Sequence, residues 1–217
     1  MKLLVMLPHG NTAAFLEKRR KALAEKKGNK IFAFSPLYCP LAVVPEKEYT
    51  AAEAKAILTS LRDTLTSGGK SSECVVDGTY CVEYGSITAA FCKVTIPFLE
   101  DIRTFCADDG FEPIENSTNG FCVGFSKVQS AHSASNTDAY KAEMLEPRSQ
   151  NDDSLGNVTQ AAGFESHRMT VFQFALIDFA PEAPFLRETA FNAEAEEPLS
   201  FKWKLINSVW KAKQKEA

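Results

Sequence analysis

The sequence predicts an α/β fold of the α+β kind, a two-lobed arrangement of duplicated β-α-β units with central antiparallel or mixed sheets. The 217 residues are 45% hydrophobic and 24% charged, a composition typical of a globular domain. Short apolar runs that fit strands alternate with segments of helical periodicity. The order strand, proline, helix, strand occurs twice, over residues 3–43 and 92–126. We therefore expect residues 1–217 to form one domain with two similar lobes.

The first elements are a strand, a helix and a second strand. A continuous apolar run over residues 3–7 ends at a proline and fits a strand buried on both faces. Asn11 or Thr12 can cap a helix that ends just before a glycine at position 28. Residues 31–44 are expected to form a long strand that prolines interrupt.

The middle of the chain predicts two helices and three strands. Thr50 begins a helix whose apolar residues recur at helical spacing. Strands over 74–83 and 87–96 are joined by a short turn. A helix over 97–108 starts at a proline, and a strand over 120–128 completes the second repeat.

Residues 129–168 are rich in Ser, Asn, Asp and Gln, and a structureless loop of that length is uncommon in a compact domain. We expect a polar, mobile insertion that contains one short helix over 138–145. A strand over 169–179 follows, and an acidic link leads to a final strand from residue 201 in which large apolar residues alternate with lysines.

Charge and cysteine usage narrow the functional class. A net charge of -4 argues against non-specific nucleic-acid binding as the main task. The six cysteines form no C-x-x-C pair, so neither a metal site nor another cofactor is expected. No apolar run approaches a membrane span, and the N-terminal run is too short for a secretion signal. We therefore expect a cytoplasmic protein in a reducing compartment, with no membrane contact.

Three stretches carry a resemblance to a known family: "MLP" after the first strand, "GFEPIENSTNGFCVGF" in the second repeat, and "KLINSV" near the end. Together with the element order, they resemble the two-histidine (2H) phosphoesterases, which include bacterial RNA 2',3'-cyclic phosphodiesterases and RNA-ligase-like proteins. The resemblance implies two lobes, each presenting a His-x-Thr or His-x-Ser motif on a central strand. Matching halves would place those two strands side by side.

The chain departs from that pattern at the residues that would carry the chemistry. Cys39 and Leu41 occupy the first motif, and Cys122 and Gly124 occupy the second. The motif needs an imidazole and a hydroxyl at positions i and i+2, which share one face of a strand. The histidines of the chain, at positions 9, 132 and 167, all lie outside both predicted strands. The resemblance therefore implies a degenerate member without the catalytic pair.

The two cysteines are interpreted as packing residues, with a ligand-facing or redox role as the alternative. A thiol becomes a nucleophile when a positive group lowers its pKa, and nothing basic adjoins Cys39 in sequence. Near Cys122 the closest basic residue is Lys127, which alternation places on the opposite face. Tyr38 is a further candidate for the cleft between the lobes.

A separate anion-binding candidate lies between the first strand and the first helix, at His9, Gly10, Asn11 and Thr12. Free backbone N–H groups at a helix N-terminus attract anions, although a polar turn with a cap explains the same residues. Lys18, Arg19, Arg20 and Lys21 are interpreted as a solvated helix face.

The end of the chain and the polar segment supply the remaining candidates. Trp203 and Trp210 lie among lysines, which suits either base stacking or a half-buried edge strand protected by lysines. His132 and His167 bracket the polar segment and could belong to a lid or be solvated.

The sequence thus favours a binding or regulatory protein without catalysis, whose partner is a nucleotide, an RNA end or another small phosphorylated ligand. One alternative is a cyclic phosphodiesterase-type hydrolase with a rearranged site that uses the cysteines or histidines. Another is a protein-interaction domain that uses the polar segment or the terminal strand. The sequence identifies no protein partner.

Overall fold

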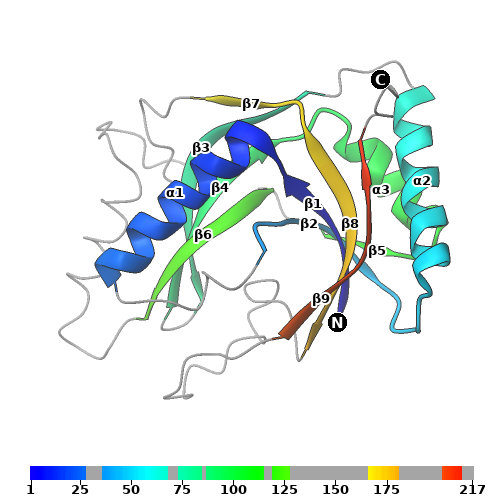
Figure 1. Cartoon of the computed structure of the whole chain (residues 1–217), viewed down its shortest axis with the longest axis horizontal. Helices are drawn as coiled ribbons and strands as arrows, with labels where there is room; N and C mark the ends of the chain where they lie inside the picture. The colour runs from blue at the N-terminus through cyan, green and yellow to red at the C-terminus, as the bar shows by residue number, and fades with distance from the viewer. Residues whose placement is uncertain are drawn as a thin grey trace.

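A computed structural model describes residues 1–27, 36–67, 73–84, 87–114, 119–127, 166–180 and 202–211. These residues form a mixed α/β structure with two antiparallel sheets (Figure 1). The helices are α1 (Gly10–Lys27), α2 (Ala51–Ser67) and α3 (Leu99–Asp108). The strands are β1 (Lys2–Pro8), β2 (Cys39–Val44), β3 (Cys74–Tyr84), β4 (Ile87–Thr95), β5 (Glu112–Pro113), β6 (Gly120–Lys127), β7 (His167–Met169), β8 (Phe172–Ala180) and β9 (Lys202–Trp210).

The five-stranded sheet has the order β5-β2-β1-β8-β9. Its central strand is β1, which confirms the prediction that residues 3–7 form a strand buried on both faces. Leu4 lies opposite Leu176 on one face, and Leu3 lies opposite Ile177 on the other, with all four side chains fully buried. The apolar side chains on both faces of this sheet therefore stabilise it by burial.

The four-stranded sheet has the order β6-β4-β3-β7. Its long β3–β4 hairpin is the pair of strands expected over 74–83 and 87–96. The prediction of a single strand over 169–179 is wrong, because Thr170 and Val171 are not part of a strand and separate β7 from β8. Before the break, β7 pairs with β3, and after it β8 pairs with β1 in the other sheet. This segment therefore connects the two sheets.

The helices cover different sheets. Helix α1 packs against β6 and β7 of the four-stranded sheet, whereas α2 and α3 contact the five-stranded sheet on the far side of the molecule (Figure 1). Helix α2 begins where the sequence predicts. The Thr50 hydroxyl accepts a hydrogen bond from the Glu53 backbone N–H at 3.2 Å, and the Glu53 carboxylate accepts one from the Thr50 backbone N–H at 2.8 Å. This reciprocal capping box satisfies N–H groups that have no partner within the helix.

Buried side chains from both sheets and from the three helices pack in one continuous cluster. The strands with Cys39 and Cys122 belong to different sheets and do not pair, so the prediction that they lie side by side is wrong. The two strands still contact each other, and a hydrogen bond joins the Cys39 thiol to the Gly120 backbone. Each strand instead pairs antiparallel with the strand before its own helix, β2 with β1 and β6 with β4.

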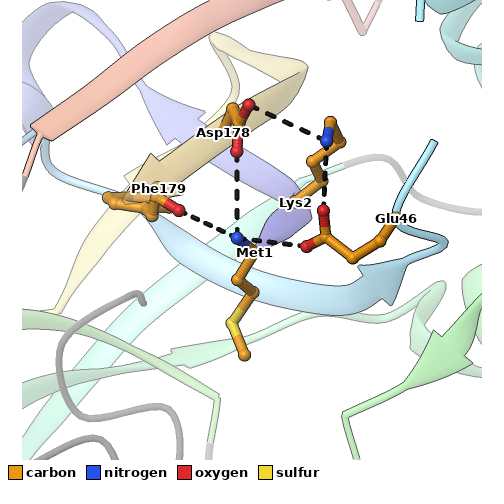
Figure 2. A network of polar contacts seen from close by, with 5 residues as sticks. All are labelled: Met1, Lys2, Glu46, Asp178 and Phe179. Atoms are coloured by element: carbon orange, nitrogen blue, oxygen red, sulfur yellow. Dashed lines mark hydrogen bonds and ion pairs between the residues drawn. The ribbon is translucent and has the colours of Figure 1, made fainter. Parts of the chain in front are cut away.

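A group of charges ties the end of β1 to its neighbours (Figure 2). The Met1 amino group donates a hydrogen bond to the Phe179 carbonyl at 2.8 Å and lies 3.1 Å from the Glu46 carboxylate. The Lys2 ammonium lies 3.1 Å from Glu46 and 3.8 Å from Asp178. The contacts join β1, β8 and the turn after β2.

Within the described ranges, no helix combines the length and apolar character that a membrane crossing requires. The predicted insertion over 129–168 lies outside the described residues except for its last three, of which His167 and Arg168 begin β7.

Candidate functional site

Strand β2, which contains Cys39 and Leu41, is part of the core. The Cys39 side chain is fully buried, and Leu41 is 3% exposed in the same cluster. Burial raises the pKa of the Cys39 thiol well above its ordinary value, and the hydrogen bond from Gly120 offsets only part of this effect. Tyr38 packs in a second cluster, with its ring centroid 5.2 Å from that of Phe179. These positions therefore act as packing residues and do not line a common surface.

Cys122 in β6 is less deeply buried than Cys39. Cys122 is partly exposed, and its sulfur lies 3.7 Å from the carbonyl oxygen of Gly124, which is itself buried. Burial raises the pKa of the Cys122 thiol to about 12, although the nearby Arg20 guanidinium acts in the opposite direction. The basic group beside this thiol thus comes from α1, a neighbour that the sequence around Cys122 does not predict. A protonated thiol is a poor nucleophile.

Arg20 is not on a solvated face, contrary to the sequence interpretation. It is 2% exposed, donates a hydrogen bond to the Pro36 carbonyl at 3.4 Å, and lies 3.7 Å from the Glu17 carboxylate. Burial lowers the pKa of its guanidinium, and Glu17 counteracts this effect. Lys18 and Lys21 on the same helix are exposed, as expected.

The predicted anion site is more accessible. Helix α1 starts at Gly10, whose φ of 61° lies in the left-handed region that favours glycine, and a Cβ there would meet nothing within 4 Å. Gly10 and Asn11 are exposed, Thr12 is buried, and the His9 backbone N–H donates to the Val171 carbonyl at 3.2 Å. The first turn of α1 contains no acidic residue. An anion can therefore approach this helix end without repulsion from within that turn.

The structure brings the end of the chain to the same place. The His9 and Trp210 rings contact each other with centroids 4.5 Å apart and planes tilted by 52°. The next residue, Lys211, places its ammonium 5.0 Å above the Phe172 ring. Burial lowers the pKa of this ammonium, while Cys74 and Glu73 raise it. The residues at the start of α1 and Trp210, which were separate candidates in the sequence, are therefore neighbours.

His167 also contacts α1. Its ring centroid lies 4.0 Å from that of Phe15, and the Arg19 guanidinium lies 5.1 Å from the same phenyl ring. The histidine belongs to β7, where it pairs with Val76, so the expectation that it lies in a loop is wrong. His132 lies outside the described residues.

We call the group formed by His9, Gly10, Asn11, Thr12, Trp210 and Lys211 the α1 entrance. It combines backbone N–H groups that can donate hydrogen bonds to an oxyanion, the Trp210 indole that can stack on a planar ring, and the Lys211 ammonium. Among the residues that the structure describes, no three His, Cys, Asp or Glu side chains are grouped so that they could hold a metal ion.

Comparisons with models of protein families, with curated proteins and with solved structures find no match to this chain. The sequence signal for the α1 entrance was limited to polar residues after an apolar strand. The contact between His9 and Trp210 spans almost the whole chain, and no local pattern predicts such a contact.

Proposed function

We propose that the α1 entrance binds a small phosphorylated ligand of the nucleotide kind and leaves it chemically unchanged. The observation that carries this proposal is the 4.5 Å contact between His9 and Trp210 beside the exposed start of α1. The exposed Gly10 and Asn11 N–H groups would hold the phosphate, because the first N–H groups of a helix have no partner within it. The Trp210 indole would stack on the base.

The environment of the cysteines supports a binding role over nucleophilic catalysis. Cys39 is fully buried, and desolvation keeps both Cys39 and Cys122 protonated near neutral pH. Neither thiol would then replace the imidazoles that the resemblance to 2H phosphoesterases requires. A small ligand would instead bind away from these strands.

We also propose that the chain is a degenerate member of the 2H phosphoesterase group. Two observations support a duplication: the strands that flank α1 and those that flank α3 pair antiparallel, and each pair contains one bulge, at Leu41 and at Val123. When the two bulges are superposed, Pro40 matches Cys122. The sequence had instead matched Cys39 with Cys122, which differs by one residue.

A second candidate is a cyclic phosphodiesterase with relocated histidines. The observation that favours it is that His9 precedes α1 and the His167 ring packs against Phe15 of the same helix. Two imidazoles could serve as acid and base on a phosphate, provided that both reach it.

Isothermal titration calorimetry with 2',3'-cyclic AMP, adenosine 3'-monophosphate and inorganic phosphate tests the first candidate. Loss of a stacked base contact worth about 1–3 kcal/mol predicts that Trp210→Ala weakens nucleotide binding by about 5- to 150-fold. Phosphate affinity should change little. The matched control is Trp203→Ala at the other end of β9, which should bind nucleotides like the parent. Equal nucleotide affinity in the parent and in Trp210→Ala would contradict the proposal.

Product analysis separates the two candidates. Incubation with 2',3'-cyclic AMP, followed by chromatography, should recover the cyclic nucleotide intact. Hydrolysis that disappears in both His9→Gln and His167→Gln would establish the relocated phosphodiesterase in its place.

A further inference from the structure

The first half of β9 forms an edge of the five-stranded sheet. Residues 202–205 pair with β8 on one side, and no described strand lies on their other side. Trp203 is 41% exposed and Leu205 is 43% exposed, and both lysines of this half are exposed. Alternate N–H and C=O groups of an edge strand point outward and can accept another strand.

The second half of β9 differs. The register shifts by one residue at Ile206, and α2 contacts β9. The Asn207 side-chain amide donates to the Ala51 carbonyl at 2.7 Å, and Val209 is buried. Among the described elements, α2 therefore covers only the second half of the strand.

The two faces of this half have different chemistry. Trp203 lies opposite Phe179 and Leu205 opposite Ile177, so both extend the apolar face formed by those buried residues. Lys202 and Lys204 lie on the other face. An added strand would place one set of its side chains beside Trp203 and Leu205, and the alternate set beside the lysines.

Charge decides between a second copy of the chain and a different partner. Antiparallel pairing of two such edges around a twofold axis would bring lysines against lysines, and like charges directly opposite each other are unfavourable. Acidic side chains at the alternate positions of a partner strand would instead complement Lys202 and Lys204.

We propose that residues 202–205 bind an extended segment of a partner protein in which acidic and apolar residues alternate, by adding a strand to the sheet. Backbone hydrogen bonds supply the pairing, the lysines select acidic positions, and Trp203 and Leu205 contact the apolar ones. This surface is distinct from the α1 entrance, so the proposed ligand binding can fail without affecting it.

The probe is a fluorescent heptapeptide in which glutamate alternates with valine or isoleucine, measured by anisotropy against the full chain. The double variant K202E/K204E should bind at least tenfold more weakly. The matched control K18E/K21E, which makes the same charge change on exposed positions of α1, should bind within twofold of the parent. A peptide with alternate backbone nitrogens methylated should lose at least tenfold in affinity, because it cannot complete the ladder.

Hydrogen exchange gives an independent readout. The outward-pointing amides among residues 202–205 should exchange quickly in the free chain and slow at least tenfold when the peptide is bound. The proposal is overturned if these amides are already as protected as those of β8 in the free chain, or if neither the charge reversal nor N-methylation alters affinity. Dimerisation that K202E/K204E alters would overturn it in favour of a second copy.

Discussion

The buried thiols predict that the folded chain loses stability steeply in alkali. Burial raises the pKa of Cys74, Cys92, Cys106 and Cys122 to about 12 from an ordinary value of 9.0, and it also raises the pKa of Cys39. Above pH 9 the unfolded chain releases these protons while the folded chain retains them. Because the folded state then binds more protons, the free energy of unfolding falls as pH rises, by an amount that approaches about 1.4 kcal/mol per pH unit for each thiol well above pH 9.

The summed effect is large enough to measure. At pH 10 five such thiols together remove about 7 kcal/mol, which is comparable to the total stability of about 5–15 kcal/mol typical of a domain. Urea unfolding in reducing buffer, followed by circular dichroism at pH 8, 9, 9.5 and 10, gives the slope. Between pH 9 and pH 10, the Cys106→Ala variant should show a slope smaller by about 1 kcal/mol per pH unit, whatever its stability at pH 8. An unchanged slope, or thiolate absorbance in the folded chain at pH 9, would refute a dry environment for these cysteines.

Three further changes test the packing and the ion pairs. Gly120→Ala should destabilise the chain by about 1–3 kcal/mol in urea unfolding, because its Cβ would lie 2.9 Å from a backbone carbonyl oxygen of β4; an unchanged midpoint would contradict this close approach. Thr50→Ala should lower the free energy of unfolding by about 1 kcal/mol, because it removes the cap of α2. Because Thr50 and Glu53 bond reciprocally, the double variant with Glu53→Ala should lower it by less than the sum of the two single variants. Hydrogen bonds from the Met1 amino group and from Lys2 lower the pKa of Glu46 below its ordinary value of 4.5, so its contribution is present above pH 4.5 and is lost as pH falls further. Because Glu46 is 64% exposed, Glu46→Gln should cost under about 1 kcal/mol at pH 7 and nothing near pH 2; an equal cost at both pH values would exclude the ion pair as its source.

Local patterns predicted most of the elements. The apolar run of β1, the helical spacing and cap of α2, and the β3–β4 hairpin all agree with the expectation, because each depends on residues close in sequence. The break between β7 and β8 was missed because Thr170 and Val171 give no glycine or proline signal. The short β5 was missed because two residues carry no period.

The candidate site shows where sequence reasoning ends. The polar residues at the start of α1 were identified from their position after a strand. The proximity of Trp210 and the electrostatic interaction of Arg20 with Cys122 depend on tertiary packing, which brings distant segments together. The bulges at Leu41 and Val123 also change the register that cysteine spacing suggested.

The most direct test of the account is a chemical-shift map of the chain titrated with 2',3'-cyclic AMP. We predict that the largest shifts occur at the Gly10, Asn11 and Thr12 amides and at the Trp210 indole N–H, while the amides of residues 39–42 and 121–124 change little. Shifts concentrated in the two cysteine strands, with the α1 entrance unchanged, would contradict the account.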